Sequence, residues 1–277
     1  MEVVKNSTSA IIFSVLIASC SGSDEILFHH DFDDEPLHTY TKAEISDTWD
    51  AFQHHATNDS IEIVKDPDPS GSRGHVMRAF YAANTVANKN SSGFFWRTKT
   101  GSHEELYFAY DVYFEEDAEF TKGGKLPGLG ILDWYTAAGQ VPDGTDRWTG
   151  GLTWRADGKI GNYVYHANQP GKYGQVFLWD DGDAGQAYLK RGQWNRIEIY
   201  YKMNTPGVLD GRLQGWFNGK LALDTNEVMY RMPGGEHLTI EAMQMYSMYG
   251  GDMTFAPTTD QHIYFDNFVV STQPLTH

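Results

Sequence analysis

Short stretches of alternating apolar and polar residues, separated by glycine-rich turns, constrain the fold of this chain more than any other feature. From Glu105 to Phe114 every second side chain is large and apolar, the period of a strand with one buried face. Further strand-like runs occur at 26–32, 61–64, 76–81, 93–98, 194–201, 213–217, 220–223, 242–249 and 262–270. Helical periodicity is nearly absent. The pattern predicts an all-β protein, a β-sandwich or β-jelly roll of antiparallel strands.

Two local signals refine this prediction. Thr41 followed by Glu44 fits a capping box, so we expect one short helix near residues 42–48. Asn218-Gly219 separates two strand-like runs and is typical of a two-residue hairpin turn. No internal repeat or linker interrupts the rest of the chain. We therefore expect a single domain over residues 21–277, and a monomer.

The charge balance limits the partners of the chain. Its 37 acidic and 21 basic residues give a formal net charge of −16. A surface this acidic argues against nucleic acid or an anionic membrane as a general partner. A polyanionic substrate would need a local cationic island. Aromatic residues at 14% and 28 glycines suit a twisted β protein whose groove can stack sugar rings.

Residues 1–20 have the pattern of an export signal. Lys5 precedes a short apolar run from Ala10 to Ala18, which is too short to span a bilayer. Leu16-Ile17-Ala18-Ser19-Cys20 resembles the lipobox of bacterial lipoproteins. We expect acylation of Cys20, a tether from Ser21, and a secreted or outer-surface lipoprotein of a bacterium. The alternative is an ordinary signal peptide with an incidental cysteine. Cys20 is the only cysteine, so an intramolecular disulfide is excluded.

The stretch from Thr121 to His166 holds the candidate site residues. It begins with Lys122-Gly123-Gly124-Lys125 and ends with a hairpin pattern, 151–155 followed by 160–165. Side chains alternate along strands, and the four candidates on the hairpin are all odd-numbered. They are Thr153, Arg155, Tyr163 and Tyr165. A three-residue turn, 156–158, places all four on one sheet face. A two-residue turn, 157–158, would put the tyrosines on the opposite face.

The ordered run of motifs from residue 105 to residue 270 resembles polysaccharide lyase family 14, the alginate lyases, and is also similar to the glucuronan lyases of family 20. The motifs are the octapeptide at 122–129, Asn204-Thr205-Pro206-Gly207, Trp216-Phe217-Asn218-Gly219-Lys220, Tyr249-Gly250-Gly251 and Ile263-Tyr264-Phe265-Asp266-Asn267-Phe268. The resemblance implies an all-β fold, a β-jelly roll sandwich of two antiparallel sheets with a concave substrate groove. It also implies cleavage of polyuronate by β-elimination. It implies a site of Lys125 (with Lys122 as rival), Arg155, Tyr163 and Tyr165. Thr153 stands where relatives often have serine.

The same residue types suit the chemistry of β-elimination, which removes the C5 proton of a uronate and expels the C4 oxygen. The C5–H is a very weak acid until the neighbouring carboxylate is neutralised, and the guanidinium of Arg155 suits that role. Tyrosine has a pKa of about 10, so it is a poor base unless cations lower that value. Lys125 or a tyrosine takes the proton, and a tyrosine protonates the leaving oxygen. We place Lys122, Thr153 and His166 as substrate-binding residues, with His166 at the rim.

Three alternatives to an alginate lyase remain open on the sequence. The first is a lyase of glucuronan or another polyuronate, and the second is a non-catalytic carbohydrate-binding module. The third, a glycoside hydrolase, would need two facing carboxylates, and the central motif offers no convincing pair. No cofactor is required by this chemistry and no catalytic metal is predicted. Asp180-Asp181-Gly182-Asp183 has oxygen ligands for a structural calcium ion, although a solvated acidic turn is the favoured interpretation.

Overall fold

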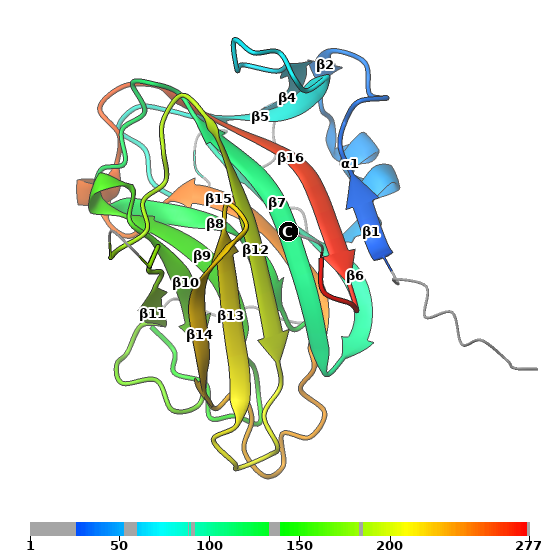
Figure 1. Cartoon of the computed structure of the whole chain (residues 1–277), viewed down its shortest axis with the longest axis vertical. Helices are drawn as coiled ribbons and strands as arrows, with labels where there is room; N and C mark the ends of the chain where they lie inside the picture. Colours follow the sequence, from blue (N-terminus) through cyan, green and yellow to red (C-terminus); the bar gives the residue numbers. More distant parts are fainter. Residues whose placement is uncertain are drawn as a thin grey trace, which may run out of the picture.

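The structure, a computed structural model, describes residues 26–52, 60–87, 89, 92–132, 139–182 and 185–275. Strands in these ranges form two antiparallel sheets that pack face to face (Figure 1). The fold class predicted from the sequence is confirmed. No helix in these ranges is long and apolar enough to cross a membrane. The predicted signal peptide and Cys20 lie outside the described residues and stay a prediction.

The larger sheet has nine strands within the described ranges. In spatial order they are β14 (Lys220–Val228), β13 (Gly211–Phe217), β12 (Trp194–Lys202), β7 (Glu105–Phe114), β16 (Gln261–Ser271), β5 (His75–Tyr81), β4 (Ile61–Lys65) and β2 (His38–Thr39), with β1 (Ile26–His30) also paired to β16. The smaller sheet has seven strands there. In spatial order they are β11 (Gln175–Leu178), β10 (Ile160–Tyr165), β9 (Thr149–Arg155), β8 (Gly123–Gly130), β15 (Ile240–Tyr249), β6 (Phe94–His103) and β3 (Ala51–Phe52).

Most of the predicted elements form where the sequence places them. The helix α1 (Lys42–Trp49) begins with the predicted capping box, in which the Thr41 hydroxyl accepts from Glu44 N and the Glu44 carboxylate accepts from Thr41 N. The hairpin turn between β13 and β14 has φ angles of 50° at Asn218 and 79° at Gly219, as its sequence predicts. The sequence did not predict the short strands β2, β3 and β11, because they lack a clear alternating pattern.

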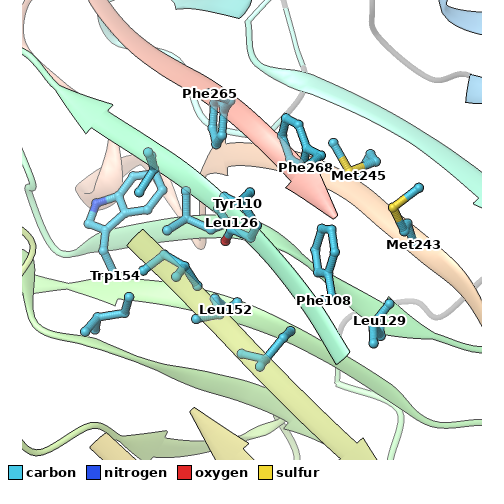
Figure 2. Close-up of a cluster of buried hydrophobic side chains, with 14 of the residues drawn as sticks. Phe108, Tyr110, Leu126, Leu129, Leu152, Trp154, Met243, Met245, Phe265 and Phe268 are labelled. Carbon is cyan, nitrogen blue, oxygen red and sulfur yellow. The ribbon is translucent and has the colours of Figure 1, made fainter. Parts of the chain in front are cut away.

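The core between the sheets collects one face of every central strand (Figure 2). From the larger sheet come Phe108, Tyr110, Phe265 and Phe268, and from the smaller sheet come Leu126, Leu129, Leu152, Trp154, Met243 and Met245. All of these side chains are fully buried. Even-numbered residues of β9 and β10 therefore point into the core, and the odd-numbered residues point to the outer face of the smaller sheet.

A buried charge network fastens the 66–74 loop to the outer face of the larger sheet. One guanidinium nitrogen of Arg73 lies 2.7 Å from a carboxylate oxygen of Asp111 and 2.7 Å from one of Asp266. The same guanidinium lies 4.4 Å from the centre of the Trp194 ring. Burial raises the pKa of Asp266 to about 6, although Arg73 lowers it. This network lies on the opposite sheet from the candidate site.

Candidate active site

The hairpin of β9 and β10 has the three-residue turn, 156–158. The main-chain N–H of Arg155 donates to the carbonyl of Lys159 at 2.7 Å, which closes the turn. Asp157 and Gly158 adopt φ angles of 64° and 84°. The resulting register pairs Thr153 with Gly161 and Tyr163 with Gly151. The two-residue alternative is wrong, and the odd-numbered candidates share one face of the sheet.

The lysine-glycine motif next to this hairpin is a strand, β8, despite Pro127 in its middle. A bulge between Leu126 and Leu129 interrupts pairing to β9, where proline cannot donate a hydrogen bond. A side chain at Gly124 would lie 2.0 Å from the Trp154 ring, so this glycine makes room for the core indole. Lys125 pairs directly with Thr153 on one side and with Met248 on the other. Its side chain therefore joins those of Arg155 and the tyrosines.

Lys125 and Tyr163 are in direct contact at the centre of this face. The lysine ammonium lies 3.2 Å from the centre of the Tyr163 ring, a cation–π contact. The Tyr163 hydroxyl lies 3.2 Å from that of Tyr165, and the rings meet edge to face at 5.5 Å. The Tyr165 hydroxyl also accepts from the main-chain N–H of Gly139 at 3.2 Å. The structure brings together the four residues predicted to be catalytic.

Burial moves the pKa values of Lys125 and Tyr163 in opposite directions. Loss of solvent, together with the nearby positive charge of Arg155, lowers the pKa of Lys125 to about 7. Burial raises the pKa of Tyr163 well above its usual value of 10, and the hydrogen bond to Tyr165 adds to this effect. A lysine near neutrality can give up its proton, whereas the phenol holds its own. Such perturbed groups in one cluster are typical of active sites.

An open cleft of about 470 Å³ lies beside this cluster of candidate residues, lined in part by Lys122, Arg155 and Lys159. None of these three cations has a carboxylate within 4.0 Å in the part of the chain that the structure describes. With Lys125 they form the local cationic island that a polyanionic substrate would need on an acidic protein. Lys122 is exposed at the start of β8.

Two predicted binding residues are buried. The hydroxyl of Thr153 donates to the carbonyls of Gly124 (2.6 Å) and Trp154 (3.0 Å), and its side chain is buried. Thr153 thus fastens β8 to β9. The predicted place of His166 at the rim is wrong, because the residue is only 1% exposed. Its ring nitrogens face the amide oxygens of Asn168 and Gln175, and burial lowers its pKa. Through these two hydrogen bonds, His166 stabilises the turn that follows β10.

The sequence interpretation missed two residues of β15 on the same face. Tyr246 lies over Gly151, where an added Cβ would come 2.0 Å from its hydroxyl, and burial raises its pKa above the usual range. The amide of Gln244 is fully buried, and neither its nitrogen nor its oxygen has a hydrogen-bond partner among the described residues. The signal was present as the alternation of Gln244, Tyr246 and Met248. This alternation places the three side chains on the face of Lys125 only because β15 pairs with β8.

No calcium site is found among the residues that the structure describes. The described ranges contain no group of three or more His, Cys, Asp or Glu side chains that could hold a metal ion. In the acidic segment, Asp180 accepts a hydrogen bond from the main-chain N–H of Gly182 at 2.8 Å, which is typical of a solvated acidic turn. Asp183 lies outside the described residues.

Comparison with known families assigns the chain to an enzyme family. The family model for polysaccharide lyase 14 matches residues 69–268. The chain belongs to polysaccharide lyase family 14. It is a polysaccharide lyase, as the resemblance implied, and a carbohydrate-binding module without activity is set aside. Among curated protein sequences, none matches this family 14 lyase.

Solved structures share the fold of this family 14 lyase. Alginate lyase Aly36B, in a doubly substituted mutant with bound alginate tetrasaccharide, is 23% identical with a TM-score of 0.74, covering 90% of this chain and 98% of that one. The marine alginate lyase from Aplysia kurodai is 22% identical with a TM-score of 0.68, covering 91% and 100%. The endo-β-1,4-glucuronan lyase from the fungus Trichoderma reesei is 11% identical with a TM-score of 0.54, covering 90% and 96%. This last match confirms the predicted, more distant similarity to glucuronan lyases.

Proposed function

We propose that this family 14 lyase cleaves a uronic-acid polymer, with alginate as the leading substrate, by β-elimination. The contact of Lys125 with Tyr163 beside Arg155 carries the proposal, because it joins a lysine of lowered pKa, a protonated phenol and a carboxylate-binding guanidinium. These are the three groups that the elimination needs.

The proposed reaction begins when Arg155 binds the uronate carboxylate and neutralises its charge. Neutral Lys125 then removes the C5 proton, and the electron pair of that bond forms the C4–C5 double bond. The C4–O bond breaks, and Tyr163 donates its phenol proton to the departing oxygen. A proton then passes from the Lys125 ammonium to the Tyr163 phenolate, which restores both groups. Tyr165 holds the Tyr163 hydroxyl in place through their 3.2 Å contact.

Alginate is the leading substrate because the family is that of the alginate lyases and Aly36B was solved with an alginate tetrasaccharide. Glucuronan is the rival, since a glucuronan lyase has the same fold at a TM-score of 0.54. The ultraviolet absorbance of the unsaturated product separates the two when the protein is mixed with alginate, polymannuronate, polyguluronate and glucuronan. New reducing ends without absorbance would instead indicate a hydrolase and contradict the proposal.

Matched variants test the site in the same assay. Lys125→Ala and Arg155→Ala should each lower kcat by about 100-fold or more, because each removes a group that acts in the transition state. Lys220→Gln is the control, since Lys220 is an exposed lysine on β14 in the other sheet. Circular dichroism checks that all variants fold. Full activity in both site variants would refute the assignment.

We also propose that the enzyme is exported and anchored to a bacterial surface through an acyl group on Cys20. The lipobox-like sequence before Cys20 supports this proposal. Expression in a bacterial host with labelled palmitate should give a labelled protein in the membrane fraction, and Cys20→Ser should release an unlabelled protein. Equal labelling of both would contradict the anchor.

A further inference from the structure

The cleft beside Arg155 is larger than the elimination chemistry requires. It measures about 470 Å³, and Arg155 is the only one of its lining residues that acts in the proposed reaction. The others are two lysines and four apolar side chains, namely Lys122, Lys159, Ala156, Val176, Leu178 and Phe255. A cleft of this composition, which shares Arg155 with the proposed site, needs an explanation of its own.

Lys159 faces the same side as Arg155 because the two residues are paired across the hairpin turn. The turn between them is the three-residue one, so its geometry determines that a lysine stands next to the catalytic arginine. Lys159 is half-buried and has no carboxylate within 4.0 Å in the part of the chain that the structure describes. In a chain with a net charge of −16, a cation held without an anionic partner is suited to a ligand carboxylate or sulfate.

Apolar surface surrounds this lysine. Leu178 is 48% exposed, and Tyr188, which forms an isolated β-bridge with Lys159, is 40% exposed. The Phe255 side of the cleft is held by the Thr121 hydroxyl, which donates to the carbonyl of Phe255 at 2.7 Å. A uronate ring presents a carboxylate on one edge and C–H groups on its faces. Cations beside exposed apolar side chains match both parts of such a ring.

We propose that this cleft is an outer subsite that binds the carboxylate of a second uronate in the same polymer chain, with Lys159 as its main contact and Lys122 as its second. This inference rests on the proposed function. Arg155 holds the sugar that is cleaved, and Lys159 holds a uronate beyond the two sugars that the breaking bond joins. The subsite therefore sets the affinity for long acidic chains more than the rate of the chemical step.

The test compares Lys159→Gln, Lys159→Arg and the control Lys220→Gln on alginate polymer and on a ladder of alginate oligosaccharides. In Lys159→Gln the KM for polymer should rise about 3- to 10-fold, the range expected for one partly exposed charge contact. The rise should disappear for the shortest oligosaccharides that are cleaved. The dependence of KM on salt should also weaken in this variant. Lys159→Arg should recover most of the affinity, and the control should match wild type.

Two outcomes would overturn the subsite. One is an unchanged KM for polymer in Lys159→Gln, and the other is an equal rise for every chain length. If the wild type makes no unsaturated product from any polyuronate, the proposed function fails separately. Equilibrium binding of alginate polymer to the wild type and to Lys159→Gln then decides the subsite. Weaker binding by the variant supports it, and equal binding overturns it.

Discussion

The ammonium of Lys125 lies 3.2 Å from the centre of the Tyr163 ring, so the base and the acid of the proposed elimination are already in contact in the free protein. The ring face attracts the cation, which partly offsets the cost of burying it. The positive charge of Arg155, on the adjacent strand, repels the ammonium of Lys125 and lowers the pKa of the lysine. The arrangement holds a lysine that is poised to lose its proton.

Lys125→Met should stabilise the protein while it abolishes activity. Lysine has a pKa of 10.5 in the unfolded chain and about 7 in the folded protein. Between these values the unfolded chain binds a proton that the folded protein does not, so the free energy of unfolding rises with pH in this window. Below pH 7 the buried cation carries its full cost. At about pH 6 the variant should therefore be more stable by roughly 1–3 kcal/mol.

Urea unfolding of wild type and Lys125→Met at several pH values measures this difference. The difference in the free energy of unfolding should narrow as pH rises from 7 toward 10.5. In this range the wild type no longer buries a charged lysine, and the variant has no group at position 125 that titrates. A less stable variant at acidic pH would show that the lysine is well solvated or well paired, and would remove the basis for its lowered pKa.

The pH dependence of kcat/KM should report the free Lys125 amine. If the neutral lysine is the base, kcat/KM for alginate should rise with pH through an apparent pKa of about 7. In Arg155→Gln the pKa of Lys125 should rise, since the variant lacks a positive charge that lowers it. Nuclear magnetic resonance of isotope-labelled lysine side chains follows this titration without any need for activity. A Lys125 pKa that does not change in Arg155→Gln would contradict the coupling.

The sequence predicted which face of the sheet holds Arg155 and Tyr163, because that face depends on local rules. Strand alternation and the parity of an odd turn place Arg155 and Tyr163 together, and both rules act over a few residues. The structure shows the expected turn, with Asp157 and Gly158 at positive φ. Family resemblance added Lys125, whose strand pairs with β9 only through the tertiary fold.

The parts that the sequence could not predict depend on contacts between distant segments. Tyr246 and Gln244 join the face because β15 pairs with β8, more than a hundred residues earlier, and no local pattern encodes that pairing. His166 is buried because Asn168 and Gln175 close around it, whereas its position after a strand suggested the rim. Pro127 reads as a strand breaker, but a bulge in β8 accommodates it.

Gly151→Ala should damage the site without changing its charges. Gly151 pairs with Tyr163, and a Cβ there would lie 2.0 Å from the Tyr246 hydroxyl. Tyr246 or the neighbouring tyrosines must shift, and small displacements of catalytic groups lower rates strongly. We expect kcat to fall about 10-fold or more, with a stability loss of about 1–3 kcal/mol from overpacking. Gly171→Ala is the control, because Gly171 has open space around it and does not have a positive φ. Wild-type kcat in Gly151→Ala would contradict a closely packed site floor.

Arg73→Met should separate stability from activity. It leaves the buried carboxylates of Asp111 and Asp266 without the cation that lies 2.7 Å from each. Removal of one partner from a buried ion network costs about 3–5 kcal/mol. The pKa of Asp266, already raised to about 6, should rise further. Thermal unfolding should show the loss, while kcat at a temperature where the variant is folded should stay unchanged. A large fall in kcat would show that the two sheets are coupled.

Tyr163→Phe should reduce kcat more than Tyr165→Phe does. Tyr163 contacts Lys125, and its raised pKa keeps the phenol protonated and ready to donate to the leaving oxygen. Tyr165 reaches the reaction through the Tyr163 hydroxyl and the main chain of Gly139, so it positions the donor. We expect losses of about 100-fold or more for Tyr163→Phe and about 10-fold for Tyr165→Phe. Steady-state kinetics on alginate gives both values. The reverse order of kcat losses would assign the proton donor to Tyr165.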